Sequence, residues 1–152
     1  MKTAEDIIRQ KGDEIYSVPA DAMLHDAVAL MVEKQIGAVL VREGERMIGI
    51  WTERDLLRSS LQEGFDLRRE PIRKHMSKPL VTVPHTETIY RLMDKILGLR
   101  LRHLPVEKDG KIIGVLSSGD VIRAALIEKT REYEELNKML GWEYYENWRW
   151  KK

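Results

Sequence analysis

Apolar residues recur at three- and four-residue spacing in two stretches of the chain, and this spacing predicts helices with one buried face. Two apolar runs around a polar turn follow each stretch, and Asp109-Gly110 in the second turn is typical of a β-hairpin. A short extended piece, "IYSVP" or "LVTVP", precedes each stretch, and a further helix is predicted to begin near Thr52 or Ser117. The helical positions are Met23, Ala27, Leu30 and Met31 in the first stretch, and Ile89, Leu92, Met93, Ile96 and Leu97 in the second. The pattern predicts the order β-α-β-β-α twice.

The two units are copies of one pattern at a fixed spacing. Gly114 and Asp120 each stand 65 positions after Gly49 and Asp55, and the register holds without a gap. Because Gly, Pro and Asp have specific backbone and charge demands, their agreement at one shift indicates a duplication. The other matched pairs are Val18-Pro19 with Val83-Pro84, Val41 with Val106, Ile48 with Ile113, Arg58 with Arg123, Ser17 with Thr82 and Thr52 with Ser117.

We therefore predict an α/β (α+β) fold in which two repeats pack as a pseudo-symmetric pair. The expected divisions are an N-terminal helix or extension (1–14), repeat one (15–65), a linker (66–78), repeat two (79–127), and a C-terminal helix with an aromatic tail (128–152). The basic linker segment "RREPIRK" is read as a solvated connection, with a small phosphate or nucleic-acid patch as the alternative.

The C-terminal segment is predicted to begin as an amphipathic helix with Tyr133, Leu136, Met139 and Leu140 and to end near Gly141. The aromatic residues beyond it are Trp142, Tyr144, Tyr145, Trp148 and Trp150. Side chains this apolar are costly to expose, so we expect them to pack on the repeats or across a dimer. Docking to a partner or to a membrane surface is the alternative.

Composition narrows the function classes. The 152 residues leave room for one compact domain or two small halves, and a net charge of +1 gives no field to steer nucleic acid. No apolar run is long enough to span a bilayer and no signal peptide is visible, so we expect a cytoplasmic protein that does not associate with a membrane. The chain has no cysteine, which excludes disulfides, thiolate zinc sites and thiol catalysis. His25, His75 and His85 lack metal-ligand spacing and are expected to be solvated or structural, so no metal is predicted.

The segment "GVLSSGD" has two glycines five positions apart behind an apolar run, as at the start of a phosphate-binding loop. Asp120 stands where that loop needs a lysine, and this carboxylate would repel phosphate. The chain also lacks the G-x-S-x-G and H-E-x-x-H motifs, so we expect no catalytic residue and rank hydrolase or transferase activity last. Thr52-x-x-Asp55 and Ser117-x-x-Asp120 also fit helix caps, a purely structural role that stabilises by about 1 kcal/mol.

From Ser17 to Ala125 the chain resembles the tandem CBS-domain (cystathionine β-synthase domain) pair, or Bateman module. Three features carry the resemblance in each copy: a hydroxyl-Val-x-Pro start, the strand "IGAVLV" or "RHLPV", and a glycine followed by two apolar residues, Ser or Thr, and Asp three positions later. The resemblance implies that the copies pack through their sheets and leave two clefts that can each hold an adenosine nucleotide.

By position, the resemblance also implies the residues of each cleft. In the first cleft they are Ser17, Ala22, Ile36, Gly37, Ala38, Arg102, His103, Ser117 and Asp120. In the second they are Thr82, Leu101, Arg102, His103, Thr52, Arg54 and Asp55. An ionised Asp can accept from both ribose hydroxyls, while Arg102 and His103 would take phosphate or else lie on the surface. Copy one has Gly37 and Ala38 at the positions of Arg102 and His103, so we expect the Asp120 cleft to bind more tightly.

The function implied is a regulatory, non-enzymatic sensor that binds AMP, ADP or ATP, forms a homodimer and acts on an unidentified effector protein. NAD and S-adenosylmethionine remain open as ligands because the same ribose-binding Asp would serve them. The alternative is a structural dimerisation module whose clefts stay empty and whose aromatic tail carries the interaction.

Overall fold

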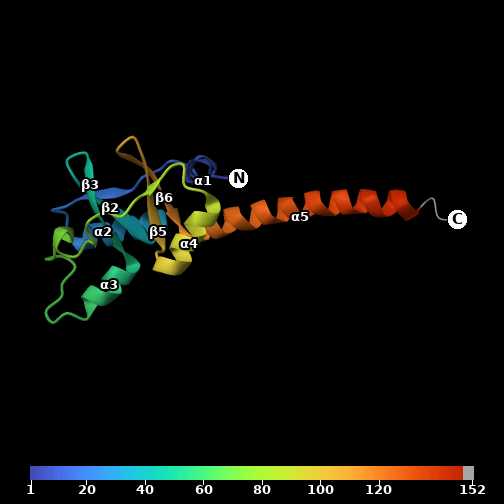
Figure 1. The fold of residues 1–152 in the computed structure, drawn as a ribbon. Helices are drawn as coiled ribbons and strands as arrows, with labels where there is room; N and C mark the ends of the chain where they lie inside the picture. Colours follow the sequence, from blue (N-terminus) through green and yellow to red (C-terminus); the bar gives the residue numbers. More distant parts are fainter. Residues whose placement is uncertain (149–152) are drawn as a thin grey trace.

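The computed structural model describes residues 1–148, with side chains up to residue 140, and contains two three-stranded sheets with helices packed around them (Figure 1). The first unit comprises β1 (Ser17–Pro19), α2 (Leu24–Lys34), β2 (Ala38–Glu43), β3 (Arg46–Thr52) and α3 (Glu53–Ser60). The second comprises β4 (Val83–Pro84), α4 (Ile89–Leu99), β5 (His103–Lys108), β6 (Lys111–Ser117) and α5 (Ser118–Trp148). Helix α1 (Ala4–Lys11) precedes the first unit, and the short 3-10 helix η1 (Ile72–Lys74) lies between the two.

The two sheets have the same topology. In each sheet the first strand runs parallel to the second, and the second runs antiparallel to the third. The irregularities repeat as well, since the register shifts at Val41/Arg42 in one sheet and at Val106/Glu107 in the other. The duplicated β-α-β-β-α fold predicted from the sequence is confirmed.

Each unit has its own hydrophobic core, and a segment from outside the unit completes it. Ile72 of η1 is fully buried in the core of the first unit, beside Trp51 and Leu24. Ala4, Ile7 and Ile8 of α1 are buried in the core of the second unit. Burying an Ile side chain stabilises by about 1.5–3 kcal/mol, so both segments are integral parts of the fold.

Residues 2–8 run along the second unit as residues 70–76 run along the first. The Leu24 amide donates to the Glu70 carbonyl at 2.9 Å, and the Ile89 amide donates to the Lys2 carbonyl at 3.0 Å. The equivalent residues Met76 and Ile8 fill the space that a β-carbon would occupy at Gly49 and Gly114. The N-terminal segment, expected as a helix or an extension, forms α1 and packs on the second unit as the linker packs on the first.

A buried histidine fixes the linker to the first unit. The His75 ring lies between the Ser59 hydroxyl, 3.0 Å from Nδ1, and the Glu70 carboxylate, 2.9 Å from Nε2. Both Ser59 and the His75 ring are almost fully buried. His75 is thus structural, whereas His25 is exposed.

Helix α5 continues well beyond the compact body (Figure 1). Two contacts join it to α4: the Tyr90 hydroxyl donates a hydrogen bond of 3.1 Å to Glu132, and the Lys129 ammonium lies over the Tyr90 ring. The prediction that Gly141 ends the helix is wrong, because α5 passes through Gly141 to Trp148. One glycine costs a helix only about 1 kcal/mol, and no proline follows to stop it. Of the aromatic residues predicted in the tail, Trp150 lies outside the described residues, and Trp142, Tyr144, Tyr145 and Trp148 are described by backbone alone.

Candidate functional site

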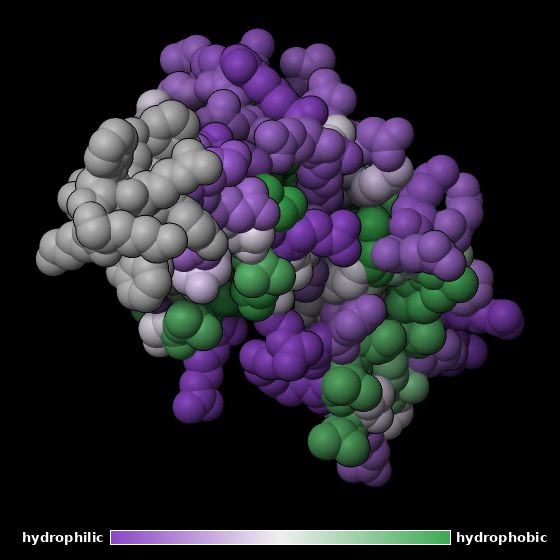
Figure 2. Space-filling model, turned by 90° about the vertical axis from the view of Figure 1, so that its right-hand side faces the viewer, coloured by the Kyte–Doolittle hydropathy of each residue, from purple (hydrophilic) through white to green (hydrophobic). Residues whose placement is uncertain are grey.

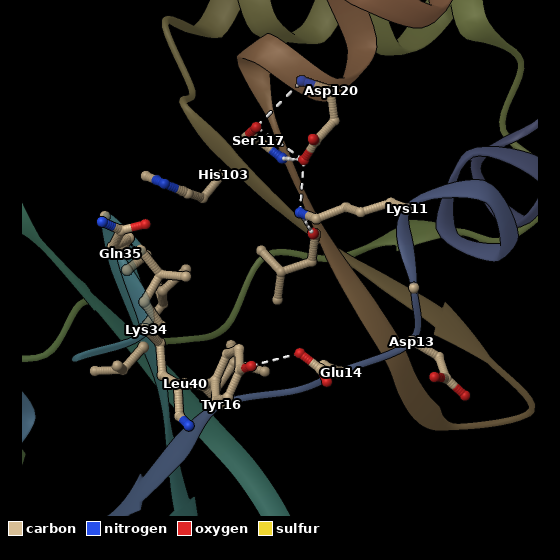
Figure 3. A pocket seen from close by; sticks show the side chains of 17 residues that line it. Lys11, Asp13, Glu14, Tyr16, Lys34, Gln35, Leu40, His103, Ser117 and Asp120 are labelled. Atoms are coloured by element: carbon tan, nitrogen blue, oxygen red, sulfur yellow. Dashed lines mark hydrogen bonds and ion pairs between the residues drawn. The ribbon is translucent and has the colours of Figure 1, made fainter. Parts of the chain in front are cut away.

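A cavity of about 680 Å³ lies between the two units, and we call it the first cleft (Figure 3). Copy one contributes the end of α2 and the start of β2, copy two contributes β6 and the start of α5, and the N-terminal segment closes one side. Its lining residues are Lys11, Gly12, Asp13, Glu14, Tyr16, Lys34, Gln35, Ile36, Gly37, Ala38, Val39, Leu40, Ile50, His103, Val115, Ser117 and Asp120.

Asp120 lies at the edge of this cleft in the first turn of α5. Its Oδ2 accepts hydrogen bonds from the Ser117 amide (2.7 Å) and hydroxyl (2.8 Å), and from the Lys11 ammonium (2.6 Å). Partial burial alone would raise the pKa of Asp120, but the bonds from Lys11 and Ser117 outweigh it and lower that pKa. The carboxylate is therefore ionised at neutral pH, and the predicted helix cap is present.

His103 lines the first cleft from the beginning of β5, where it pairs with Ser117 of β6. Burial lowers the pKa of the imidazole, and the nearby Glu53 carboxylate only partly offsets this. The ring is neutral at pH 7 and can both donate and accept a hydrogen bond. A β-carbon at Gly37 would lie 3.4 Å from both His103 Nε2 and the Glu53 carboxyl, so Gly37 lies in contact range of both side chains.

A second cavity of about 370 Å³, the second cleft, occupies the pseudo-symmetric position. Asp55 caps α3 there, because its Oδ2 accepts from the Thr52 amide (3.0 Å) and hydroxyl (3.1 Å). Its lining also includes four arginines: Arg54, Arg58, Arg100 and Arg102. The second cleft thus has a smaller volume and carries more cationic side chains than the first.

The structure brings together most, but not all, of the residues predicted for each cleft. Of those predicted for the first cleft, its lining includes Ile36, Gly37, Ala38, His103, Ser117 and Asp120. Of those predicted for the second, its lining includes Thr52, Arg54, Asp55, Leu101, Arg102 and His103.

Four predictions place residues where they do not line the expected cavity. Ser17 pairs with Leu40 inside the first sheet, and Ala22 packs against the core of the first unit. The Thr82 hydroxyl donates to Glu107, away from the second cleft. Arg102 is exposed and lines only the second cleft, so His103 is the one of the two predicted phosphate ligands that lines the first.

Sequence reasoning missed several residues that line the first cleft, among them Lys11, Tyr16, Lys34 and Gln35. Lys34 and Gln35 stand 65 positions before Leu99 and Arg100, which line the second cleft, so the repeat offset could have found them once one cleft was known. Lys11 had no such signal, because it precedes both copies.

Among the described residues, no cluster of three or more His, Cys, Asp or Glu side chains could hold a metal ion. Within residues 1–148, no helix combines the length and hydrophobicity needed to cross a bilayer.

The fold agrees with comparisons to known proteins. The family model for the CBS domain matches residues 4–62 and again residues 72–127. The chain belongs to the CBS-domain family. As a CBS-domain pair, it is 34% identical over 144 residues to the mitochondrial CBS domain-containing protein CBSX3 of Arabidopsis thaliana, covering 89% of this chain and 70% of that protein.

Solved CBS-domain structures share the fold. The CBS domain of NE2398 superposes with a TM-score of 0.78 at 34% identity, covering 83% of this chain and 99% of that one. The CBS domain protein PAE2072 of Pyrobaculum aerophilum, whose structure contains AMP, superposes with a TM-score of 0.71 at 26% identity, covering 84% of this chain and 97% of that one.

Proposed function

We propose that this CBS-domain pair is a regulatory sensor of adenosine nucleotides, without catalytic activity of its own. The observation that carries the proposal is the ionised Asp120 carboxylate at the edge of a cavity of about 680 Å³, a volume in the range typical of small-molecule sites. The AMP complex of PAE2072 supports an adenosine nucleotide as the ligand.

The lining of the first cleft suits the three parts of a nucleotide. Asp120 can accept hydrogen bonds from the ribose hydroxyls, since an ionised carboxylate is a pure acceptor. Ile36, Leu40 and Ile50 offer apolar surface for the base, beside the small Gly37. Donors for phosphate are available from the neutral His103 and from the Lys11 ammonium at the rim.

Regulation would follow from the position of the cleft between the two copies. A ligand that contacts both units favours the arrangement of the pair that fits it best, and it shifts the population toward that arrangement. Asp120 lies in the first turn of α5, so the helix that begins at the ligand is the same helix that projects from the body. We propose that an effector protein reads the state of the pair through this helix.

One observation favours a second candidate, a homodimerisation or interaction module. Every side chain from residue 129 to 140 is exposed, including the apolar Tyr133, Leu136, Met139 and Leu140. Figure 2 views the molecule from the side on which α5 projects, and hydrophobic side chains reach the surface there beside hydrophilic ones. Helices without tertiary contacts are marginal in water, so this part of α5 would be stabilised by a second copy or by a partner.

Calorimetric titration of ligand-stripped protein with AMP, ADP, ATP, NAD and S-adenosylmethionine tests the sensor proposal. We expect micromolar binding of at least one of the three adenine nucleotides, which corresponds to about −8 kcal/mol. Absence of heat with all five ligands would leave the interaction module as the better account.

A further inference from the structure

The two clefts differ at one pair of equivalent positions that lies outside the 65-residue repeat. Lys11 is the last residue of α1, which packs on the second unit, and it lines the first cleft, whereas Pro79 follows the linker and lines the second. The paths correspond because Ile8 packs on Gly114 as Met76 packs on Gly49, and three further residues lead from each to Lys11 or Pro79. The first cleft therefore has an ammonium group where the second has an apolar ring.

The Lys11 ammonium occupies the oxygen that a ribose would need. Its Nζ lies 2.6 Å from Asp120 Oδ2 and 2.8 Å from the Val115 carbonyl oxygen (Figure 3). With the two bonds from Ser117, three donors converge on this one carboxylate oxygen. A ribose that engages both carboxylate oxygens must displace at least one donor, and Lys11 is the only one of the three outside the helix cap.

In the second cleft the same oxygen is less crowded. Asp55 Oδ2 accepts from the Thr52 amide and hydroxyl, and the nearest cation, Arg58, lies 4.0 Å from Oδ1. A ribose at Asp55 meets no ammonium on the oxygen that caps the helix.

The backbone of Lys11 is held in place, whereas its side chain can change conformation. Ile7 and Ile8 of the same helix are buried against the second unit, which holds the backbone of α1 in place. The Lys11 side chain, by contrast, is 41% exposed at the rim of the cleft, and its four-carbon stem can swing. The ammonium can therefore leave Asp120 without any movement of α1.

We propose that Lys11 makes the first cleft selective for phosphorylated adenosine ligands over the nucleoside. The inference rests on the proposed function, because it assigns a selectivity to that same cleft. A nucleoside that takes Asp120 leaves the ammonium without its anionic partner. A nucleotide carries its phosphate one ribose ring away from the 2′- and 3′-hydroxyls. The Lys11 ammonium can therefore exchange the Asp120 carboxylate for the phosphate and keep an anionic partner.

The test compares AMP with adenosine in an Asp55→Ala background, so that binding reports on the first cleft. The variants are Lys11→Met, which keeps the length of the side chain, and Lys11→Arg, which keeps the charge. The matched control is Lys34→Met, which removes the same charge from the same cleft, because Lys34 pairs with Glu33 and not with Asp120.

With Lys11 present, AMP should bind more tightly than adenosine. In Lys11→Met that preference should fall by about tenfold, the scale of one hydrogen bond to a charged group. Lys11→Arg should retain most of it, and Lys34→Met should change it by less than about threefold. The ratio of two affinities measured on one sample is insensitive to a partly unfolded fraction, so a less stable variant still gives an answer.

A preference that is unchanged in Lys11→Met would overturn the inference, because Lys11 would then only brace α1 against β6, while the sensor function would stand. An equal loss in Lys34→Met would also overturn it, since general charge and not the contact with Asp120 would set the preference. Failure of AMP and adenosine to bind even with Lys11 present would overturn the inference for AMP, and the proposed function would fall with it only if ADP and ATP also gave no heat.

Discussion

The Asp120 carboxylate holds the first turn of α5 and borders the first cleft at the same time. Replacing it with alanine would cost about 1 kcal/mol of stability through the lost cap, in addition to any effect on a ligand. Asp55 caps α3 through the same two bonds from Thr52, so Asp55→Ala loses an equivalent cap at the other cleft. The two substitutions therefore form a matched pair for separating folding from binding.

His103 is predicted to make stability depend on pH. Burial first, and then the nearby Lys11 and Arg102 cations, lower the pKa of its imidazole below the ordinary value of 6.5. The unfolded chain therefore takes up a proton before the folded protein does as the pH falls. This group has no effect well above pH 6.5, and below it the free energy of unfolding decreases until the folded imidazole also protonates.

We expect His103→Gln to reduce the loss of stability between pH 7.5 and pH 5.5, measured by urea unfolding at both values. The exposed His25→Gln serves as the control and should lose as much stability as the unmodified chain. An undiminished loss in His103→Gln would show that the folded protein does not disfavour the imidazolium at this position.

Among the elements, α1 and α5 are the ones whose roles the sequence did not reveal. The offset of 65 residues predicted both sheets and their helices, because Gly, Pro, Asp and the apolar runs recur in register. The match between residues 2–8 and residues 70–76 rests on backbone hydrogen bonds and on two pairs of apolar side chains, Ala4 with Ile72 and Ile8 with Met76. Almost any sequence can satisfy such bonds, so the match left no motif.

The length of α5 was misjudged for a different reason. Glycine after an amphipathic stretch is typical of a helix end. That rule applies when the glycine adopts the left-handed backbone conformation and a helix-breaking residue follows it. Residues 142–148 contain neither proline nor a second glycine, and the helix continues. The low helix propensity of Gly141 therefore mattered less than the absence of a helix-breaking residue after it.

The exposed part of α5 is expected to be dispensable for the fold and for the clefts. A chain ending at Glu132 keeps the contacts with Tyr90 and removes only residues whose side chains, up to residue 140, are exposed. We expect its melting temperature to stay within a few degrees of that of the full chain and its affinity for AMP to stay within about twofold. A large drop in melting temperature would show that this part of α5 stabilises the body.

On the scale of the whole molecule, the duplication creates two similar clefts and the flanking segments make them different. Asp120 and Asp55 occupy equivalent caps, while Lys11 borders one cleft and four arginines border the other. The sequence predicted which residues repeat, since a repeat is recognised from residue identities at a fixed spacing. It placed Arg102 in both clefts, whereas Arg102 lines only the second, because the direction of a side chain just before β5 depends on how the two units pack.

The most direct test of the account is a calorimetric titration with AMP of the unmodified chain, Asp120→Ala and Asp55→Ala. The account predicts a binding event in the unmodified chain that Asp55→Ala retains and Asp120→Ala weakens at least tenfold. AMP binding that is equally strong in Asp120→Ala and Asp55→Ala, or no binding to the unmodified chain, would contradict it.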